Sequence, residues 1–228
     1  MRTDTTLEAD VRSTPQWEEN RFGGLEDPID QSFSGSERNK WYYNIAGQKG
    51  RSFSDLSTMS GMDSISDGRV FAIWDFNRDG RYDVVLTNAN APLLHLYENQ
   101  IQTDNHVIAF KFVGGMTDAN TDARLSNRDG YGAIVSLEIA DDLTIKREFR
   151  CGEGFAGQNS DTLLIGIGEF QTAQRVSVTW PSGITNEIKE VQANSLVTFF
   201  ESVADGEPEH KIEQYSRRTK DPSELKSQ

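Results

Sequence analysis

The feature that most constrains the fold is an acidic loop between two short apolar runs. The loop, Asp75–Asp83, carries oxygen-bearing side chains at its positions 1, 3, 5 and 9, and position 6 is Gly80. Val70–Trp74 precedes it and Val84–Thr87 follows it, and both runs are made mainly of β-branched and aromatic residues. Two such runs joined by a turn that contains glycine predict two adjacent strands with a tight, polar connection.

The loop also predicts a calcium site. Ca²⁺ takes six to eight oxygen ligands, and a chain that curls around the ion can supply them from alternate positions. The ion would relieve the repulsion among three carboxylates within one turn. The predicted ligands are the side chains of Asp75, Asn77, Asp79 and Asp83 and the carbonyl of Arg81.

Other interpretations of the loop are less suitable. An EF-hand needs glutamate at position 12, where this chain has Leu86, and it joins two helices. Magnesium demands a stricter octahedron and retains several waters. The remaining alternative is a solvated acidic turn held by hydrogen bonds from its own Asp and Asn side chains.

The rest of the middle of the chain is also strand-like. Three further runs have β-forming composition: Ala133–Ile139, Val176–Trp180 and Leu196–Phe200. No window of 12 residues shows a convincing helical period, and Gly, Asn and Asp fill the gaps. We therefore expect an all-β core of antiparallel strands joined by short turns.

Two local predictions follow from glycine and proline. Pro181 at the second position and Gly183 at the fourth suit a four-residue turn that begins at Trp180, which would present a large apolar face at a strand end. Gly166 and Gly168 alternate with isoleucine, a pattern that predicts close backbone approach on one face of a sheet.

Charge and composition exclude several classes. The chain of 228 residues has 36 acidic and 23 basic side chains, a net charge of −13, and its basic residues are scattered, so we expect no nucleic-acid partner. No stretch is long and apolar enough to span a membrane. Residues 1–10 do not resemble a signal peptide. One cysteine, Cys151, and three histidines make a zinc site unfavourable.

The loop and its flanking runs resemble the FG-GAP/VCBS repeat of β-propellers. That repeat has an apolar strand, the pattern D-x-[DN]-x-D-G-x-x-D, and a second apolar strand, and its loop holds calcium. The upstream stretch fits too, with Tyr43, Asn44, Gly47, Gly50 and Phe53 at matching positions. The resemblance implies a partial propeller blade over residues 39–103, and a single blade cannot close a propeller.

The following region resembles the ASPIC/UnbV domain. The matching stretches are Asn127–Ala133, Gly152–Phe155, Leu163–Gly168 and the run Val178–Gly183, which contains W-P-S-G. The usual serine before Gln158 is replaced by Gly157. The resemblance implies a β-sandwich-like or barrel-like domain over residues 104–202. Residues 1–38 and 203–228 are polar and predict tails.

The resemblance and the missing catalytic signatures together indicate a calcium-binding, non-catalytic interaction module. Its partner would be another protein or further propeller blades, and the family favours an extracellular or periplasmic location. Two alternatives stay open: an enzyme or accessory protein of bacterial secondary metabolism, or a C-terminal fragment of a longer propeller protein. A chemical role for Cys151 or His95 would support the first alternative, whereas we expect Cys151 to be a buried free thiol and His95 to be structural.

Overall fold

The structure is a computed structural model. It describes residues 2–3, 37–45, 52–89, 91–116, 121–150, 152–154, 156–203 and 206–215. The chain divides into two compact units. The first unit comprises Met1–Ile73, Asp83–Ile101 and Gly154–Gly157, and the second comprises Trp74–Tyr82, Gln102–Glu153 and Gln158–Gln228. Most of the acidic loop therefore belongs to the second unit.

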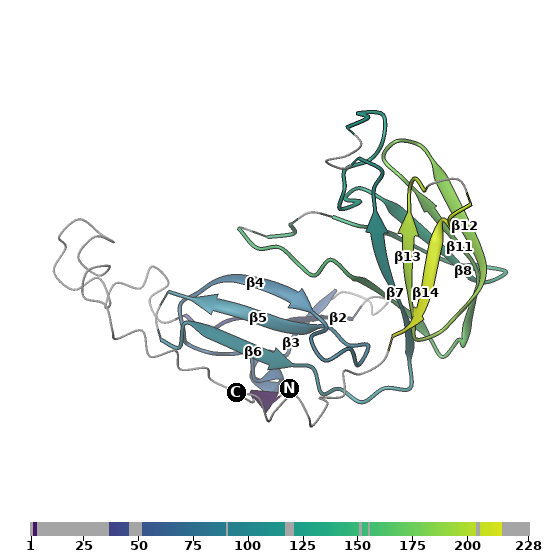
Figure 1. Cartoon of the computed structure of the whole chain (residues 1–228). Coiled ribbons are helices and arrows are strands. Elements are labelled where there is room, and N and C mark those ends of the chain that lie inside the picture. Colours follow the sequence, from purple (N-terminus) through teal and green to yellow (C-terminus); the bar gives the residue numbers. More distant parts are fainter. Residues whose placement is uncertain are drawn as a thin grey trace, which may run out of the picture. The chain divides into compact units, whose positions relative to one another are not determined.

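The first unit contains a four-stranded sheet with the order β1-β6-β5-β4 (Figure 1). A separate hairpin of β2 and β3 and the short helix α2 belong to the same unit. The bounds are β1 Arg2–Thr3, β2 Tyr42–Asn44, β3 Phe53–Asp55, α2 Ser57–Ser60, β4 Gly68–Trp74, β5 Asp83–Asn88 and β6 Leu94–Glu98.

Few apolar side chains are buried in the described part of the first unit. Its buried apolar residues are Leu86 and Tyr97, whereas Tyr42, Phe53 and Phe71 are each more than half exposed. The hydrophobic contribution to the stability of this unit is correspondingly small, because that contribution scales with the apolar area removed from water.

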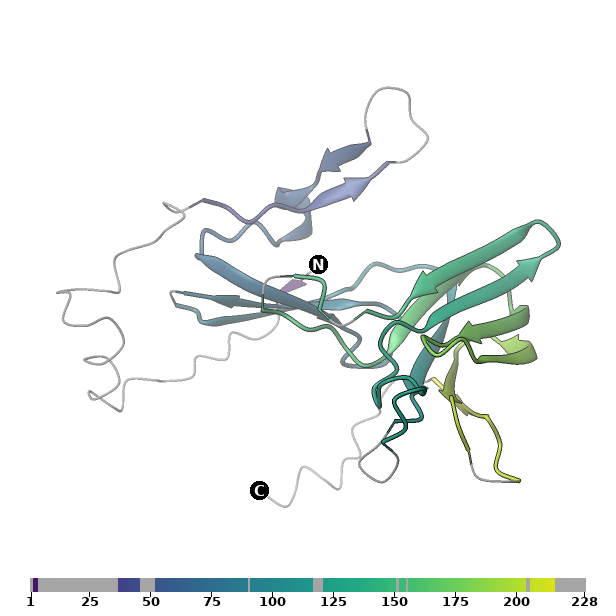
Figure 2. The ribbon, with the colours of Figure 1, turned by 90° about the horizontal axis from the view of Figure 1, so that it is seen from above.

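The second unit contains two four-stranded sheets, ordered β10-β7-β13-β14 and β12-β11-β8-β9. Figure 2 shows them from above, with the teal hairpin β8–β9 in one sheet and the yellow strand β14 in the other. The bounds are β7 His106–Val113, β8 Ile134–Ala140, β9 Leu143–Glu148, β10 Leu163–Gly168, β11 Thr172–Thr179, β12 Thr185–Gln192, β13 Ser195–Phe200 and β14 His210–Gln214.

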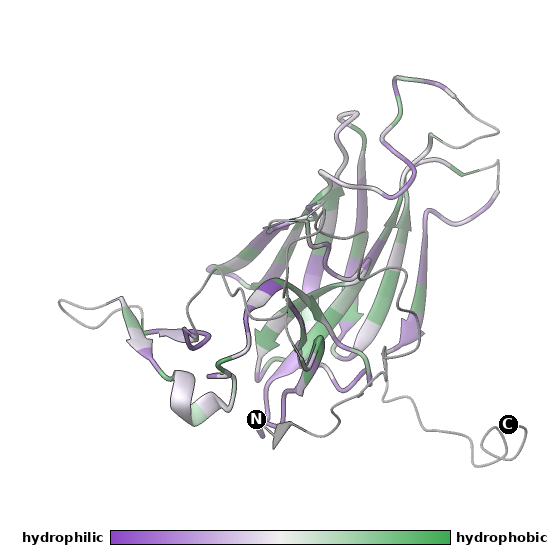
Figure 3. Cartoon of the chain, turned by 90° about the vertical axis from the view of Figure 1, so that its left-hand side faces the viewer, coloured by the Kyte–Doolittle hydropathy of each residue, from purple (hydrophilic) through white to green (hydrophobic). Residues whose placement is uncertain are grey.

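One hydrophobic core joins the two sheets. Phe110 and Phe199 come from one sheet, Leu137 and Val176 from the other, and all four are fully buried in the same cluster. Apolar residues accordingly gather along these strands (Figure 3). Alternate residues of β7, β8, β11 and β13 face this core, which is how two sheets pack in a sandwich. The prediction of an all-β chain is confirmed.

Two predicted details are confirmed and two are corrected. The five predicted apolar runs lie on strands except for Ala133 and Trp180 at their ends. The turn at Trp180 closes with a 2.9 Å hydrogen bond from the Gly183 N–H to the Trp180 carbonyl. However, β7 and β13 pair in parallel. The predicted close approach at Gly166 and Gly168 is wrong, because a Cβ at either position would have no heavy atom within 4 Å.

The predicted tails lie mostly outside the described residues. Their described parts include two strands, because β1 pairs with β6 and β14 pairs with β13. In the described ranges, the structure has no helix of the length and apolar character needed to cross a membrane.

Candidate metal centre

The loop side chains in the second unit bond to the loop's own backbone. The Asp79 N–H donates to Asp75 Oδ1 and to Asn77 Oδ1, each at 3.0 Å, and the Gly80 N–H donates to Asp75 Oδ2 at 2.8 Å. The Arg81 N–H donates to Asp79 Oδ1 at 3.1 Å. Gly80 has a φ of +85°, a left-handed conformation that favours glycine. These bonds turn the side-chain oxygens inward.

Asp75 is buried at the start of the loop. Its side chain is 5% exposed, and Oδ2 also accepts a 2.9 Å hydrogen bond from the hydroxyl of Tyr215. Burial raises the pKa of the Asp75 carboxyl, and the hydrogen bonds from Gly80, Tyr215 and Asp79 oppose that shift only in part. A nearby cation would therefore stabilise the ionised form of this carboxyl group.

Asp79 has a cationic partner within the loop. Its Oδ2 pairs with the Arg81 guanidinium and accepts a 3.0 Å hydrogen bond from the Asn77 side-chain amide. The Asp79 side chain is 7% exposed. The Arg81 side chain thus supplies positive charge to a turn that also contains two carboxylates in the second unit.

The oxygen donors fit a hard divalent cation in kind. Asp75, Asn77 and Asp79 contribute side-chain oxygens. The Oδ1 atoms of Asp75 and Asp79 each accept a hydrogen bond from a backbone N–H, and a carboxylate oxygen has two lone pairs. Across the described ranges, no three Asp, Glu, His or Cys side chains are grouped as metal ligands. The predicted set within the second unit would therefore combine two carboxylates, an amide oxygen and the Arg81 carbonyl.

Asp83, the predicted ligand at position 9, begins β5 in the first unit. It is fully buried there, and its Oδ1 accepts a 2.7 Å hydrogen bond from the Asn99 N–H. Its membership of the metal site stays a prediction from the loop pattern.

An open cavity of about 670 Å³ lies beside the loop within the second unit. Arg78, Asp79 and Gly80 line it together with His106 and Tyr215. The Arg78 guanidinium lies 5.9 Å from the centre of the Tyr215 ring, within the range of a cation–π contact. The cavity gives Asp79 a route to solvent.

Sequence reasoning missed Tyr215 and Arg78. Tyr215 lies 140 residues from Asp75 in the chain, in a segment predicted to be a polar tail. The one signal was composition: Tyr215 is the only Phe, Trp or Tyr in the polar segment 203–228.

The histidines and the cysteine that were considered for a chemical role are not ligands of the predicted calcium site. His95 is on β6, where Nδ1 is 3.1 Å from the Tyr97 hydroxyl, and burial lowers its pKa. His106 is on β7, and its Nε2 is 2.6 Å from the side-chain nitrogen of Gln171. Cys151 lies outside the described residues.

Comparison with known proteins found a similarity to one family over a range that lies mostly in the second unit. Residues 123–206 match the ASPIC and UnbV family model. The matched range of the ASPIC/UnbV domain begins ahead of β8 and ends after β13, so it includes the W-P-S-G turn and excludes β7, β14 and the acidic loop. No curated protein matches the chain.

Proposed function

We propose that the protein is a calcium-stabilised, non-catalytic binding module in which the ion rigidifies the 75–83 loop. The observation that carries the proposal is the arrangement of Asp75, Asn77 and Asp79, whose carboxyl and amide oxygens lie in one turn fixed by hydrogen bonds to its own backbone. A turn ordered in this way loses little conformational freedom when an ion binds, which favours affinity.

The same hydrogen bonds are also expected in the alternative structure, an acidic turn that is stable without a metal ion. Calcium is favoured by the burial of Asp75 and Asp79, since two buried carboxylates in one turn need more positive charge than a single arginine side chain provides. The spacing of the oxygen donors and the FG-GAP/VCBS resemblance of the loop support the same choice.

The binding role rests on the first unit. Its four-stranded sheet has the size of a propeller blade, and its exposed Tyr42, Phe53 and Phe71 offer apolar area for contact. We propose that the partner is another protein or further propeller blades. Among the described residues, no observation supports an enzymatic function as well as these observations support a binding function.

Calcium titration tests the proposal. The intact chain should have a higher melting temperature in excess calcium than in chelator. At a hundredfold excess over Kd, calcium should raise the free energy of unfolding by about 2.7 kcal/mol. Magnesium at the same concentration should have a smaller effect. Equal melting temperatures in calcium and in chelator would overturn the metal assignment.

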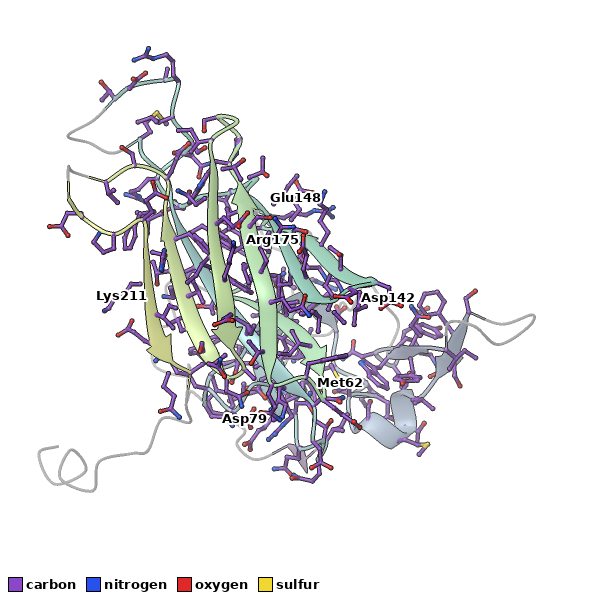
Figure 4. All side chains as sticks on the ribbon, turned by 90° about the vertical axis from the view of Figure 1, so that its right-hand side faces the viewer. Met62, Asp79, Asp142, Glu148, Arg175 and Lys211 are labelled. Atoms are coloured by element: carbon purple, nitrogen blue, oxygen red, sulfur yellow. The ribbon has the colours of Figure 1, made fainter. Side chains whose placement is uncertain are left out.

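A pair of variants localises the effect. Asp79→Ala should abolish most of the response to calcium, because it removes a ligand of the ion. The loss of its contacts with Asn77 and Arg81 should lower the melting temperature equally in calcium and in chelator, so the response to calcium is the quantity to compare. Asp142→Asn is the matched control, since it removes one negative charge from the exposed β8–β9 turn (Figure 4). This control should respond to calcium like the unmodified protein.

A further inference from the structure

Tyr215 joins the acidic loop to the C-terminal strand of the second unit. Its hydroxyl donates to Asp75 Oδ2 at 2.9 Å, and its ring, 7% exposed, packs in a small apolar cluster with Ala109 and Leu196. The ring and the hydroxyl therefore serve different contacts: the ring holds the strand end to the sheet, and the hydroxyl reaches the first residue of the loop.

Strand β14 depends on this anchor. Among the described strands it lies at the edge of its sheet and pairs with β13, and its last four residues are exposed (Figure 4 labels Lys211). The Tyr215 N–H continues the ladder with a 2.7 Å hydrogen bond to the Asn194 carbonyl. Edge strands with little buried area open readily. At the start of β14 the His210 ring lies 6.3 Å from the Phe199 ring, and the buried Tyr215 ring secures the other end of the strand.

The oxygen that Tyr215 contacts is also the one that closes the turn. Asp75 Oδ2 accepts from the Gly80 N–H at 2.8 Å, while Oδ1 accepts from the Asp79 N–H at 3.0 Å. The carboxylate is thus oriented from two sides, by the turn and by the C-terminal strand. Partners of this type, which hold a metal-binding carboxylate in place, commonly change metal affinity by about 10- to 100-fold.

We infer that Tyr215 is a positioning residue that couples calcium binding at the acidic loop to docking of strand β14. The inference rests on the proposed calcium site. Binding free energies are reciprocal, so if the docked Tyr215 favours the calcium-binding form of Asp75, calcium favours the docked strand by the same factor. The loop then controls how firmly the C-terminal edge of the sheet is closed.

The test uses the intact chain and two measurements. Tyr215→Phe keeps the buried ring and removes the hydroxyl, and calcium titration by calorimetry should give about tenfold weaker binding than in the unmodified protein. Hydrogen exchange, measured with and without calcium, should show that calcium slows the amides of His210–Tyr215 in the unmodified protein and has much less effect on them in the variant.

Tyr131→Phe is the matched control. It removes a phenol hydroxyl in the same unit that accepts a hydrogen bond from Gln158, while its ring stacks on Phe149 with centroids 5.0 Å apart. This variant should bind calcium with unchanged affinity and keep the calcium effect on β14.

The outcomes separate the two claims. No calcium binding to the unmodified protein would overturn both the calcium site and the coupling. Normal calcium binding by Tyr215→Phe, or exchange at His210–Tyr215 that calcium does not change in the unmodified protein, would overturn the coupling and leave the calcium site standing. The exchange comparison in the unmodified protein keeps the test decisive even if a variant fails to fold.

Discussion

At the scale of single residues, Trp180 is the side chain whose loss should harm the second unit most. It is 2% exposed, its indole N–H donates to Asn186 Oδ1, and its ring meets Phe112 edge-on at 6.1 Å. Trp180→Ala should lower the free energy of unfolding by about 3–5 kcal/mol, because it opens a large cavity and leaves Asn186 without its donor. Urea denaturation measures the loss.

Ile184 provides the comparison for that prediction. It lies just beyond the same turn and is 39% exposed, so Ile184→Ala should change the free energy of unfolding by no more than about 1 kcal/mol. Equal losses in the two variants would show that the indole contributes no more than any apolar side chain at this turn.

Glu201 is a second residue whose burial has a measurable consequence. It is 5% exposed, accepts hydrogen bonds from the Gly115 N–H at 2.6 Å and the Ser126 N–H at 2.8 Å, and accepts one from the Ser126 hydroxyl at 2.7 Å. Burial alone would raise its pKa, but these bonds, with one from Ser182, outweigh it and lower the pKa below the ordinary 4.5.

The sign of the pH effect follows from that lowered pKa. The folded state holds the carboxylate ionised more strongly than the unfolded state, so its stabilisation is complete above about pH 4.5 and is lost as the pH falls through the folded pKa. Glu201→Gln should destabilise the protein by about 2 kcal/mol at pH 7 and flatten this acid dependence. Urea denaturation from pH 7 to pH 3 measures both effects.

Glu138→Gln serves as the control, because Glu138 is a half-exposed carboxylate that pairs with Arg175 across the surface of the sheet. It should cost less than about 1 kcal/mol and leave the acid dependence unchanged. An acid dependence that is the same in Glu201→Gln and in the unmodified protein would contradict the role assigned to Glu201.

At the scale of elements, the end of β7 is held by a close backbone approach. The Gly114 N–H donates to the Arg128 carbonyl at 2.9 Å, and a Cβ on Gly114 would lie 1.8 Å from the Asn127 carbonyl oxygen. Gly114→Ala should therefore separate the two segments and cost ~3 kcal/mol or more. Thermal denaturation measures it.

Gly166→Ala on β10 is the matched glycine control, since its Cβ would meet nothing within 4 Å. It should alter the free energy of unfolding by less than about 0.5 kcal/mol. If Gly166→Ala proved as damaging as Gly114→Ala, the contrast between a crowded and an open glycine would be wrong.

The strands that could be predicted from sequence are those with a mostly buried apolar run. Two examples are Val176–Trp180 and Leu196–Phe200, which are recognisable because alternate residues are apolar and enter the core. Strands β9 and β12 are largely exposed, so their sequences lack that signal. They form strands because they pair with β8 and β11, which lie on predicted apolar runs. The parallel pairing of β7 with β13 was unpredictable because no hairpin links strands so far apart.

The candidate site shows the same limit. The spacing of Asp75, Asn77 and Asp79 and the position of Gly80 predicted a tight turn lined with oxygens, because those contacts are local. The contact of Asp75 with Tyr215 spans 140 residues, and no local pattern encodes it. Sequence therefore indicates the donors of the loop, while the residues that orient them depend on the tertiary fold.

At the scale of the whole molecule, the two units differ in how much apolar surface they bury. The described part of the second unit has a core of 17 buried hydrophobic residues drawn from both sheets. The first unit buries Leu86 and Tyr97 among its described residues and exposes several aromatic side chains. Because opening free energy follows buried apolar contact, the two units should open with different free energies.

Native-state hydrogen exchange on the intact chain should reveal that difference. After correction for intrinsic rates with the unfolded chain, amides of β7, β8, β11 and β13 should exchange at least about tenfold more slowly than amides of β4, β5 and β6. Calorimetry should show a matching lower-temperature transition for the first unit. Equal protection in both sets of strands would contradict the prediction. It would mean that the apolar area buried within each unit does not determine which unit has the lower free energy of opening.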